Sequence, residues 1–171
     1  MSLALAFGPL PAGGDDNLIA LKAAFVYKFT RFIDWPVAPA DRPFIIAVIG
    51  DPAMHAALAA LEEGSREVAG RPIRVRGSCD LDAADACQIL FIGAAAEDRL
   101  ADMVRRAAGR PVLLVGDTSG FAGRGVAIEL FRKPDILGKR EQLRFRIDPK
   151  ALSGRGLTVS AQLYEVGEVL R

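Results

Sequence analysis

Three short runs of apolar residues constrain what this 171-residue chain can fold into more than any other feature of its sequence. The runs lie within residues 44–49, 88–92 and 112–115, the second of them beginning after Gln88, and Gly-Asp follows the first and the third. An uninterrupted apolar run of this length predicts a strand that is buried on both faces. Residues 53–63 and 97–108 carry apolar side chains at helical spacing, and Asp51 and Pro52 suit a helix start. The alternation predicts a mainly parallel sheet covered by helices.

The chain before the first of these strands predicts one long helix. Asp15, Asp16 and Asn17 offer N-caps, and the apolar pattern continues to Trp35, immediately before Pro36. Its second half is rich in aromatic side chains, namely Phe25, Tyr27, Phe29, Phe32 and Trp35. We expect this segment to be the central core helix. The alternative is that part of its aromatic surface docks onto a partner helix.

A different pattern follows the third apolar run. Residues 126–131 and 143–147 predict two strands joined by a polar, turn-rich segment, which favours an antiparallel hairpin at the edge of the sheet. Residues 71–76 predict a half-exposed strand, and residues 157–170 predict a closing helix. Together these elements predict one α/β domain over residues 15–171. Its expected fold is a Rossmann-like or flavodoxin-like three-layer sandwich, with a mainly parallel sheet and an antiparallel edge hairpin.

Charge and residue content argue against several functional classes. With 22 basic and 21 acidic side chains the net charge is +1, and no basic run with interleaved aromatics marks a nucleic-acid surface. No apolar stretch reaches the roughly 20 residues of a membrane span. The single histidine, His55, has no serine or cysteine nucleophile beside it, and the two cysteines lack the short spacing of a zinc site. We therefore expect no catalytic residue, no cofactor and no metal.

The N-terminal segment and the cysteines bear on the compartment. Residues 1–14 are apolar and small but lack the basic start and the full apolar core of a signal peptide. Ala4-Leu5-Ala6 has the form of a signal-peptidase site, so the segment is interpreted as the remnant of an export signal or as an expression leader. Cys79 and Cys87 bracket a short acidic connection that can bring them within bonding range, and we expect a disulfide. Two unpaired cysteines in a cytosolic protein are the alternative.

One place on the predicted fold suits a small ligand. Two of the buried strands end in Gly50-Asp51 and Gly116-Asp117, at the carboxyl edge where ligands of open α/β sheets gather. Asp51 and Asp117, with Ser119 close to the second, therefore form a candidate ligand crevice. The simpler interpretation is that each aspartate caps the segment that follows it.

Several segments resemble one known family in chain order. Residues 21–36, LKAAFVYKFTRFIDWP, look like the opening signature of the YfiR family, and aromatic-rich helices that end in Trp-Pro are rare. Further on, residues 87–92 resemble the family's cysteine-led inner strand, residues 125–131 its glycine-led strand and residues 143–148 the strand that enters the final segment. Residues 157–170 are similar to the closing helix, although Ser160-Ala161-Gln162-Leu163 departs from the family's usual paired small polar residues followed by leucines. The resemblance spans about residues 18–170.

The resemblance implies a periplasmic regulator without catalytic activity. It implies that the chain binds the outer sensor domain of a membrane-anchored diguanylate cyclase and holds it inactive, which controls cyclic di-GMP and biofilm formation. It also supports export and the Cys79–Cys87 disulfide, and a homodimer is compatible with it. The matched motifs are core elements by their pattern, so none of them transfers a partner-binding residue.

The loop of the predicted hairpin is the candidate partner-binding surface. Ile136 and Leu137 lie there among basic residues, and an apolar anchor with a basic rim suits protein docking. The candidate residues are Arg132, Lys133, Ile136, Leu137, Lys139 and Arg140. The alternative is that both apolar side chains fold back onto the sheet.

Overall fold

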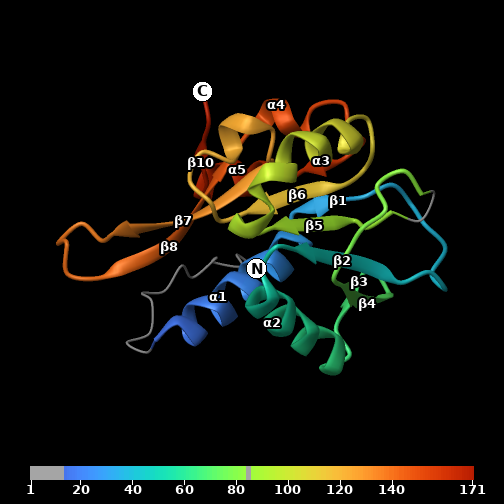
Figure 1. Cartoon of the computed structure of the whole chain (residues 1–171), viewed down its shortest axis with the longest axis horizontal. Coiled ribbons are helices and arrows are strands. Elements are labelled where there is room, and N and C mark those ends of the chain that lie inside the picture. The colour runs from blue at the N-terminus through green and yellow to red at the C-terminus, as the bar shows by residue number, and fades with distance from the viewer. Residues whose placement is uncertain (1–13, 84–85) are drawn as a thin grey trace.

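The structure is a computed structural model that describes residues 14–83 and 86–171, and Figure 1 shows a central sheet between helices. The helices are α1 (Asp15–Phe29), α2 (Pro52–Glu63), α3 (Leu100–Ala107), α4 (Pro149–Leu152) and α5 (Ala161–Val166), with the 3-10 helices η1 (Ala94–Arg99) and η2 (Ala122–Arg124). The main sheet contains β2 (Phe44–Ile49), β3 (Glu67–Val68), β4 (Arg71–Arg76), β5 (Ile89–Ile92), β6 (Leu113–Gly116), β7 (Ile128–Pro134), β8 (Glu141–Ile147) and β10 (Glu168–Val169). A separate small sheet pairs β1 (Ile33–Asp34) with β9 (Thr158–Val159).

The main sheet has the strand order β10-β8-β7-β6-β5-β2-β4-β3. The strands from β4 to β7 pair in parallel, while β7 pairs with β8, and β3 with β4, antiparallel. Taken in chain order, the parallel strands follow 2-1-3-4-5, the order of flavodoxin-like folds. The predicted fold class, a mainly parallel sheet with an antiparallel hairpin towards one edge, is confirmed.

Alternate side chains of the buried strands supply two separate cores, one on each side of the sheet. On one side, the β-strand residues Ile46, Phe91 and Val115 pack with α1 and α2. On the other, Leu90 and Leu114 pack with α3.

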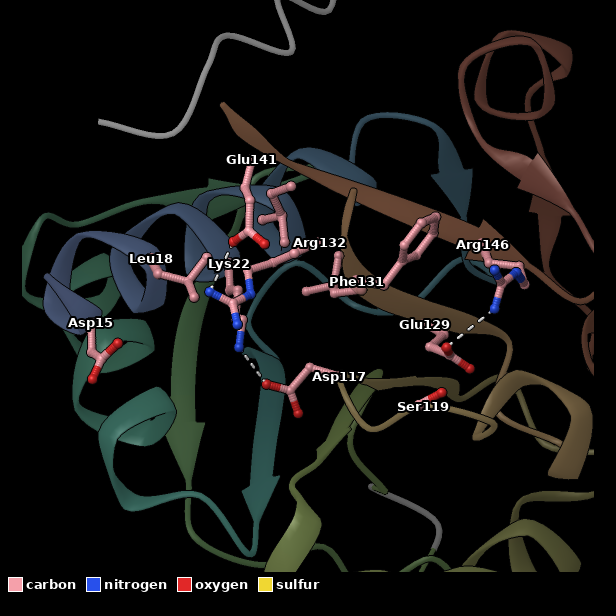
Figure 2. Close-up of a pocket in the computed structure, with 12 residues that line it drawn as sticks. Asp15, Leu18, Lys22, Asp117, Ser119, Glu129, Phe131, Arg132, Glu141 and Arg146 are labelled. Atoms are coloured by element: carbon pink, nitrogen blue, oxygen red, sulfur yellow. Dashed lines mark hydrogen bonds and ion pairs between the residues drawn. The ribbon is translucent and has the colours of Figure 1, made fainter. Parts of the chain in front are cut away.

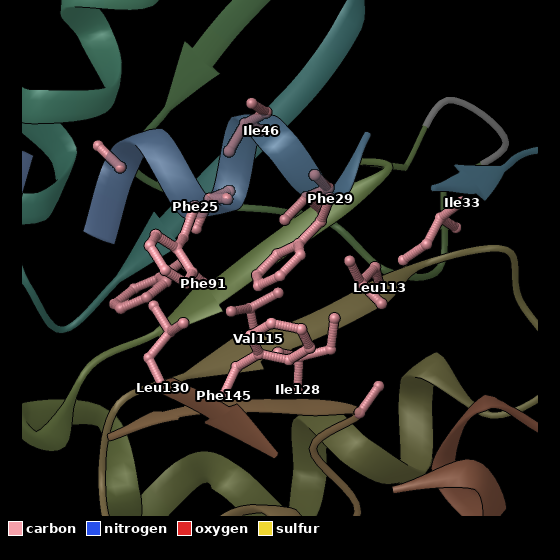
Figure 3. Close-up of a cluster of buried hydrophobic side chains, with 14 of the residues drawn as sticks. Phe25, Phe29, Ile33, Ile46, Phe91, Leu113, Val115, Ile128, Leu130 and Phe145 are labelled. Carbon is pink, nitrogen blue, oxygen red and sulfur yellow. The ribbon is translucent and has the colours of Figure 1, made fainter. Parts of the chain in front are cut away.

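Two aromatic residues of α1 anchor this helix on the first face (Figure 3). Phe25 and Phe29 meet Phe145 of β8 edge to face, with ring centroids 6.3 and 5.1 Å apart. Both α1 side chains are buried, as expected for a core helix.

The predicted N-terminal helix is too long at its C-terminal end. The helix ends at Phe29, and the chain turns so that Ile33 pairs with Val159 in the small sheet. The backbone oxygen of Phe32 accepts the N–H of Ser160 at 2.8 Å. Backbone groups around Ile33, which a longer helix would have bonded internally, are thus hydrogen-bonded by β9 and Ser160, from near the other end of the sequence.

The predicted closing helix over residues 157–170 is wrong. The segment is divided into β9, α5 and β10, because Ser160 caps α5 by accepting the N–H of Gln162 and Gly167 ends it. A Cβ on Gly167 would lie 2.5 Å from the Phe145 ring, so only glycine fits where the chain passes into β10. Beside it, β10 pairs with the last two residues of β8, so the hairpin lies next to the outermost strand over that short stretch.

Candidate functional site

The tip of the β7–β8 hairpin presents two apolar side chains to solvent. The hairpin extends well beyond the helices of the molecule (Figure 1), and at its tip Ile136 is 104% and Leu137 74% exposed. Asp135 holds the turn together: its carboxylate accepts the N–H of Lys139 at 2.8 Å, and its own N–H donates to the Arg140 carbonyl at 2.7 Å. The apolar side chains therefore stand out from a hydrogen-bonded turn and do not fold back onto the sheet.

Two of the four basic residues of the candidate surface form ion pairs, and the other two do not. Arg132 forms an ion pair with Glu141 at 3.0 Å, and Lys133 forms one with Glu168 of β10 at 2.6 Å. In the part of the chain that the structure describes, Lys139 and Arg140 make no ion pair. The rim of the tip thus carries two positive charges that remain available to a partner.

The hydrogen bond from Lys133 holds the pKa of Glu168 below its ordinary value, against an opposing effect of burial. The nearby cations Lys133, Arg146 and Arg144 act in the same direction as the hydrogen bond. Glu168 therefore remains a carboxylate that ties Lys133 of β7 to β10.

An open cleft of about 580 Å³ lies between α1, the loop after β6 and the β7–β8 hairpin (Figure 2). Asp117 and Ser119 line it, as does Lys22 of α1, whose ammonium group lies 2.6 Å from the Asp117 carboxylate. Figure 2 shows a second pair, Arg132 with Glu141, on the hairpin side of the cleft. The cleft walls therefore carry charges that neutralise one another in pairs.

The deepest charge of this cleft is Glu129 of β7, which is 1% exposed. One of its oxygens accepts the Ala122 N–H at 2.9 Å, and the other lies 3.3 Å from the guanidinium of Arg146. That guanidinium also stacks over the Phe131 ring, 4.8 Å from its centroid. The sequence analysis did not predict the role of Glu129. The pattern that could have indicated it is a carboxylate between two apolar residues of a predicted strand.

Asp51 lies apart from the cleft lining. Its carboxylate accepts the Met54 N–H at 2.9 Å and so caps α2, in the way that the simpler interpretation expects. Gly50 and Gly93 pack backbone to backbone beside it, since a Cβ on Gly93 would lie 2.4 Å from the Gly50 oxygen. The structure thus brings Asp117 and Ser119 into one cleft and fills the point between β2 and β5 where ligands of such sheets usually enter.

The Cys79–Cys87 disulfide is present and closes the connection between β4 and β5. Asp82 in this connection pairs with Arg106 of α3 at 2.8 Å. Within the described residues, no three histidine, cysteine, aspartate or glutamate side chains gather as a metal site would require. Residues 1–13, which hold the predicted export remnant, lie outside the described part of the chain.

Comparison with known families decides what kind of protein this is. The model of the YfiR/HmsC-like family (DUF4154) matches residues 19–168. The chain belongs to the YfiR/HmsC-like family. This is a regulatory, periplasmic family rather than a catalytic one. A search of curated proteins finds no match.

Among solved structures, this YfiR/HmsC-like chain is similar to a conserved domain protein from Vibrio cholerae O1 biovar El Tor str. N16961. The TM-score is 0.53 at 14% identity, and the match covers 90% of this chain and 60% of the Vibrio chain. The chain thus spans 60% of the length of that protein, and the likeness concerns the fold alone. In residues 14–83 and 86–171, no helix has both the length and the apolar content needed to cross a bilayer.

Proposed function

We propose that this chain is a periplasmic regulator that binds the sensor domain of a membrane-anchored diguanylate cyclase and represses it, which limits cyclic di-GMP and biofilm formation. The observation that carries the proposal is the YfiR/HmsC-like match over residues 19–168. The disulfide between Cys79 and Cys87 supports an oxidising compartment. The role requires a binding surface and no chemistry from the chain itself.

The docking surface proposed for this role is the hairpin tip. Large apolar side chains at the centre of an interface supply much of its binding energy, while charged residues at the rim steer the partner. Ile136 and Leu137 are the apolar pair, and Lys139 and Arg140 form the rim. Because the hydrogen-bonded turn already holds these side chains outward, little conformational entropy is lost when they are buried.

The test is a binding assay with the purified periplasmic domain of a membrane-anchored diguanylate cyclase from the same organism. The double variant Ile136→Ser with Leu137→Ser is expected to weaken binding at least about a hundredfold, because it removes two apolar anchors. Val37→Ser is the matched control, since Val37 is equally exposed (103%) and lies far along the chain in the segment after β1. Equal binding by wild type and the double variant would exclude the tip, and no binding by wild type would exclude the proposed function.

A second candidate function is the binding of a small polar ligand in the cleft of Asp117 and Ser119. The volume of about 580 Å³ and the several charged groups favour it. A thermal-shift screen with periplasmic metabolites tests it: a shift that is lost in Asp117→Asn but kept in Asp51→Asn would support the cleft. Asparagine also caps helices, so the second variant preserves α2 and serves as the control.

A further inference from the structure

The outer half of β8 presents backbone groups that the hairpin itself does not use. The register places Glu141 opposite Pro134, which has no N–H to donate. Asp135 donates to the Arg140 carbonyl, and hydrogen-bonded pairs alternate with non-bonded pairs along an antiparallel ladder. The N–H and C=O groups of Glu141 and Leu143 therefore point away from β7.

A contact at the other end of β8 agrees with this direction. Leu170 donates its N–H to the Ile147 carbonyl at 2.8 Å from the outer side, and Ile147 belongs to the same alternating set as Leu143. On that side, β10 pairs only with Arg146 and Ile147. In the part of the chain that the structure describes, no strand covers the outward groups of Glu141 and Leu143.

An uncovered strand edge is a template for another extended segment. A strand laid against this edge would exchange up to four backbone hydrogen bonds, from the N–H and C=O groups of Glu141 and Leu143. A groove of about 610 Å³ runs along the same part of the hairpin and is lined by Gln142, Ile136 and Leu137 among others. The added strand would therefore also reach the exposed apolar pair at the tip.

The charge of the hairpin favours one kind of added strand. Residues 132–144 hold five basic and two acidic side chains, a net charge of +3, and Glu168 of β10, which pairs with Lys133, reduces the local sum to +2. Both acids already have partners, because Asp135 accepts within the turn and Glu141 pairs with Arg132. A second copy of the chain would place the same positive charge against itself, whereas an acidic segment would be complementary.

We propose that β8 extends its sheet by accepting an extended, acidic segment of the partner along Glu141–Arg144, with the partner's apolar side chains against Ile136 and Leu137. The identity of the partner rests on the proposed function. The strand addition itself is a property of this chain and is tested without the cyclase.

Titration of the isotope-labelled chain with short peptides tests the edge directly. A hexapeptide of alternating valine and glutamate is expected to shift the amide signals of Glu141 and Leu143 and to slow their hydrogen exchange. The matched peptide of valine and lysine is expected to do neither. The same acidic peptide with N-methyl groups on alternate residues should lose binding, because it cannot donate to the edge. The inference would be overturned if the amide shifts were confined to the cleft of Asp117, or if the acidic and the basic peptide gave equal shifts. It would also be overturned if neither peptide gave any shift.

Two variants at one position separate the backbone from the side chain. Glu141→Pro removes an outward N–H and none of the ladder bonds to β7, as Pro134 does on the opposite strand. It is expected to bind the acidic peptide about tenfold more weakly than wild type. Glu141→Ala keeps the N–H and removes a negative charge, so it is expected to bind at least as well as wild type. Equal affinities of the two variants would contradict strand addition.

The cyclase domain distinguishes failure of this inference from failure of the proposed function. If the domain binds wild type and Glu141→Pro equally, the partner docks in another way and the proposed function stands. If it does not bind at all while the acidic peptide does, the edge is real and the proposed partner is wrong. A dimer of the chain alone that Glu141→Pro dissociates would assign the edge to self-association and overturn the acidic partner.

Discussion

Glu129 shows how one buried charge can organise the base of the hairpin. Its carboxylate joins η2, through the Ala122 N–H, to β8, through Arg146. Glu129→Gln keeps an acceptor but removes the buried charge that faces Arg146, whose other carboxylate partner is Glu168 at 3.6 Å. We therefore expect the free energy of unfolding to fall by about 2–3 kcal/mol. Urea denaturation followed by circular dichroism measures the change.

The control for this variant is a carboxylate at the surface. Glu165→Gln alters an exposed carboxylate of α5, and its effect is expected to stay below about 0.5 kcal/mol. If both variants lowered the free energy of unfolding by the same amount, the burial of Glu129 would not be the cause of the loss.

The Lys133–Glu168 pair makes part of the stability depend on pH. The pKa of Glu168 is lowered in the folded chain, first by the hydrogen bond from Lys133. A lowered pKa gives a stabilisation that is fully present above the glutamate pKa of the unfolded chain and is lost as the pH falls through the folded-state value. Because the side chain of Glu168 is 32% exposed, solvent screening keeps this contribution small.

Lys133→Ala is therefore expected to raise the pKa of Glu168 towards its ordinary value. Carboxyl-carbon NMR titration measures this pKa directly. Arg132→Ala is the control, since Arg132 pairs with Glu141 instead. A Glu168 pKa that moves in the control and not in Lys133→Ala would contradict the assignment.

For individual helices and strands, the sequence predicts those features that a local residue pattern determines. The apolar runs at residues 44–49 and 112–115 became β2 and β6, because a continuous apolar run is compatible only with burial on both faces. The end of α1 and the division of residues 157–170 were not predictable in this way. The end of α1 depends on the pairing of Ile33 with Val159, and the end of α5 depends on the Phe145 ring beside Gly167. Both contacts join segments that are distant in the sequence.

The candidate site was predictable to a similar extent. Ile136 and Leu137 stand out in the sequence as apolar residues in a polar turn, and the structure places both in solvent. Only one side of the cleft was predictable from the sequence, because the strand ends pointed to Asp117. The position of Lys22 opposite Asp117 depends on how α1 crosses the sheet. No local pattern reports such a crossing.

The disulfide is expected to stabilise one connection rather than the whole fold. The bond between Cys79 and Cys87 closes a short loop, and replacing both residues with alanine should lower the free energy of unfolding by about 2–3 kcal/mol. Unfolding of the wild type with and without a reducing agent should show the same difference. Alkylation of both thiols in protein recovered from its native compartment would contradict a role for the bond in the cell.

For the whole molecule, the structure separates the tip of the β7–β8 hairpin from the two cores, one of which includes the base of the hairpin. Leu130, Leu143 and Phe145 of the hairpin are buried in the core shared with α1 and α2, whereas none of residues 134–141 belongs to either core. Figure 1 shows this end of the hairpin extending away from the helices. Lys133 and Gln142 form a hydrogen-bonded pair of the ladder, the geometry that a two-residue turn closes. Residues 134–141 can therefore be replaced by Asn-Gly without a change of register.

This shortened chain is expected to keep its melting temperature within about 3 °C of wild type, because the deleted residues contribute nothing to either core. It should nevertheless lose binding to both the cyclase domain and the acidic peptide, since the tip and half of the strand edge are gone. Calorimetry and a binding titration on the same sample measure the two properties. A large fall in melting temperature would show that residues 134–141 contribute to the stability of the fold, and retained binding would place the docking surface elsewhere on the molecule.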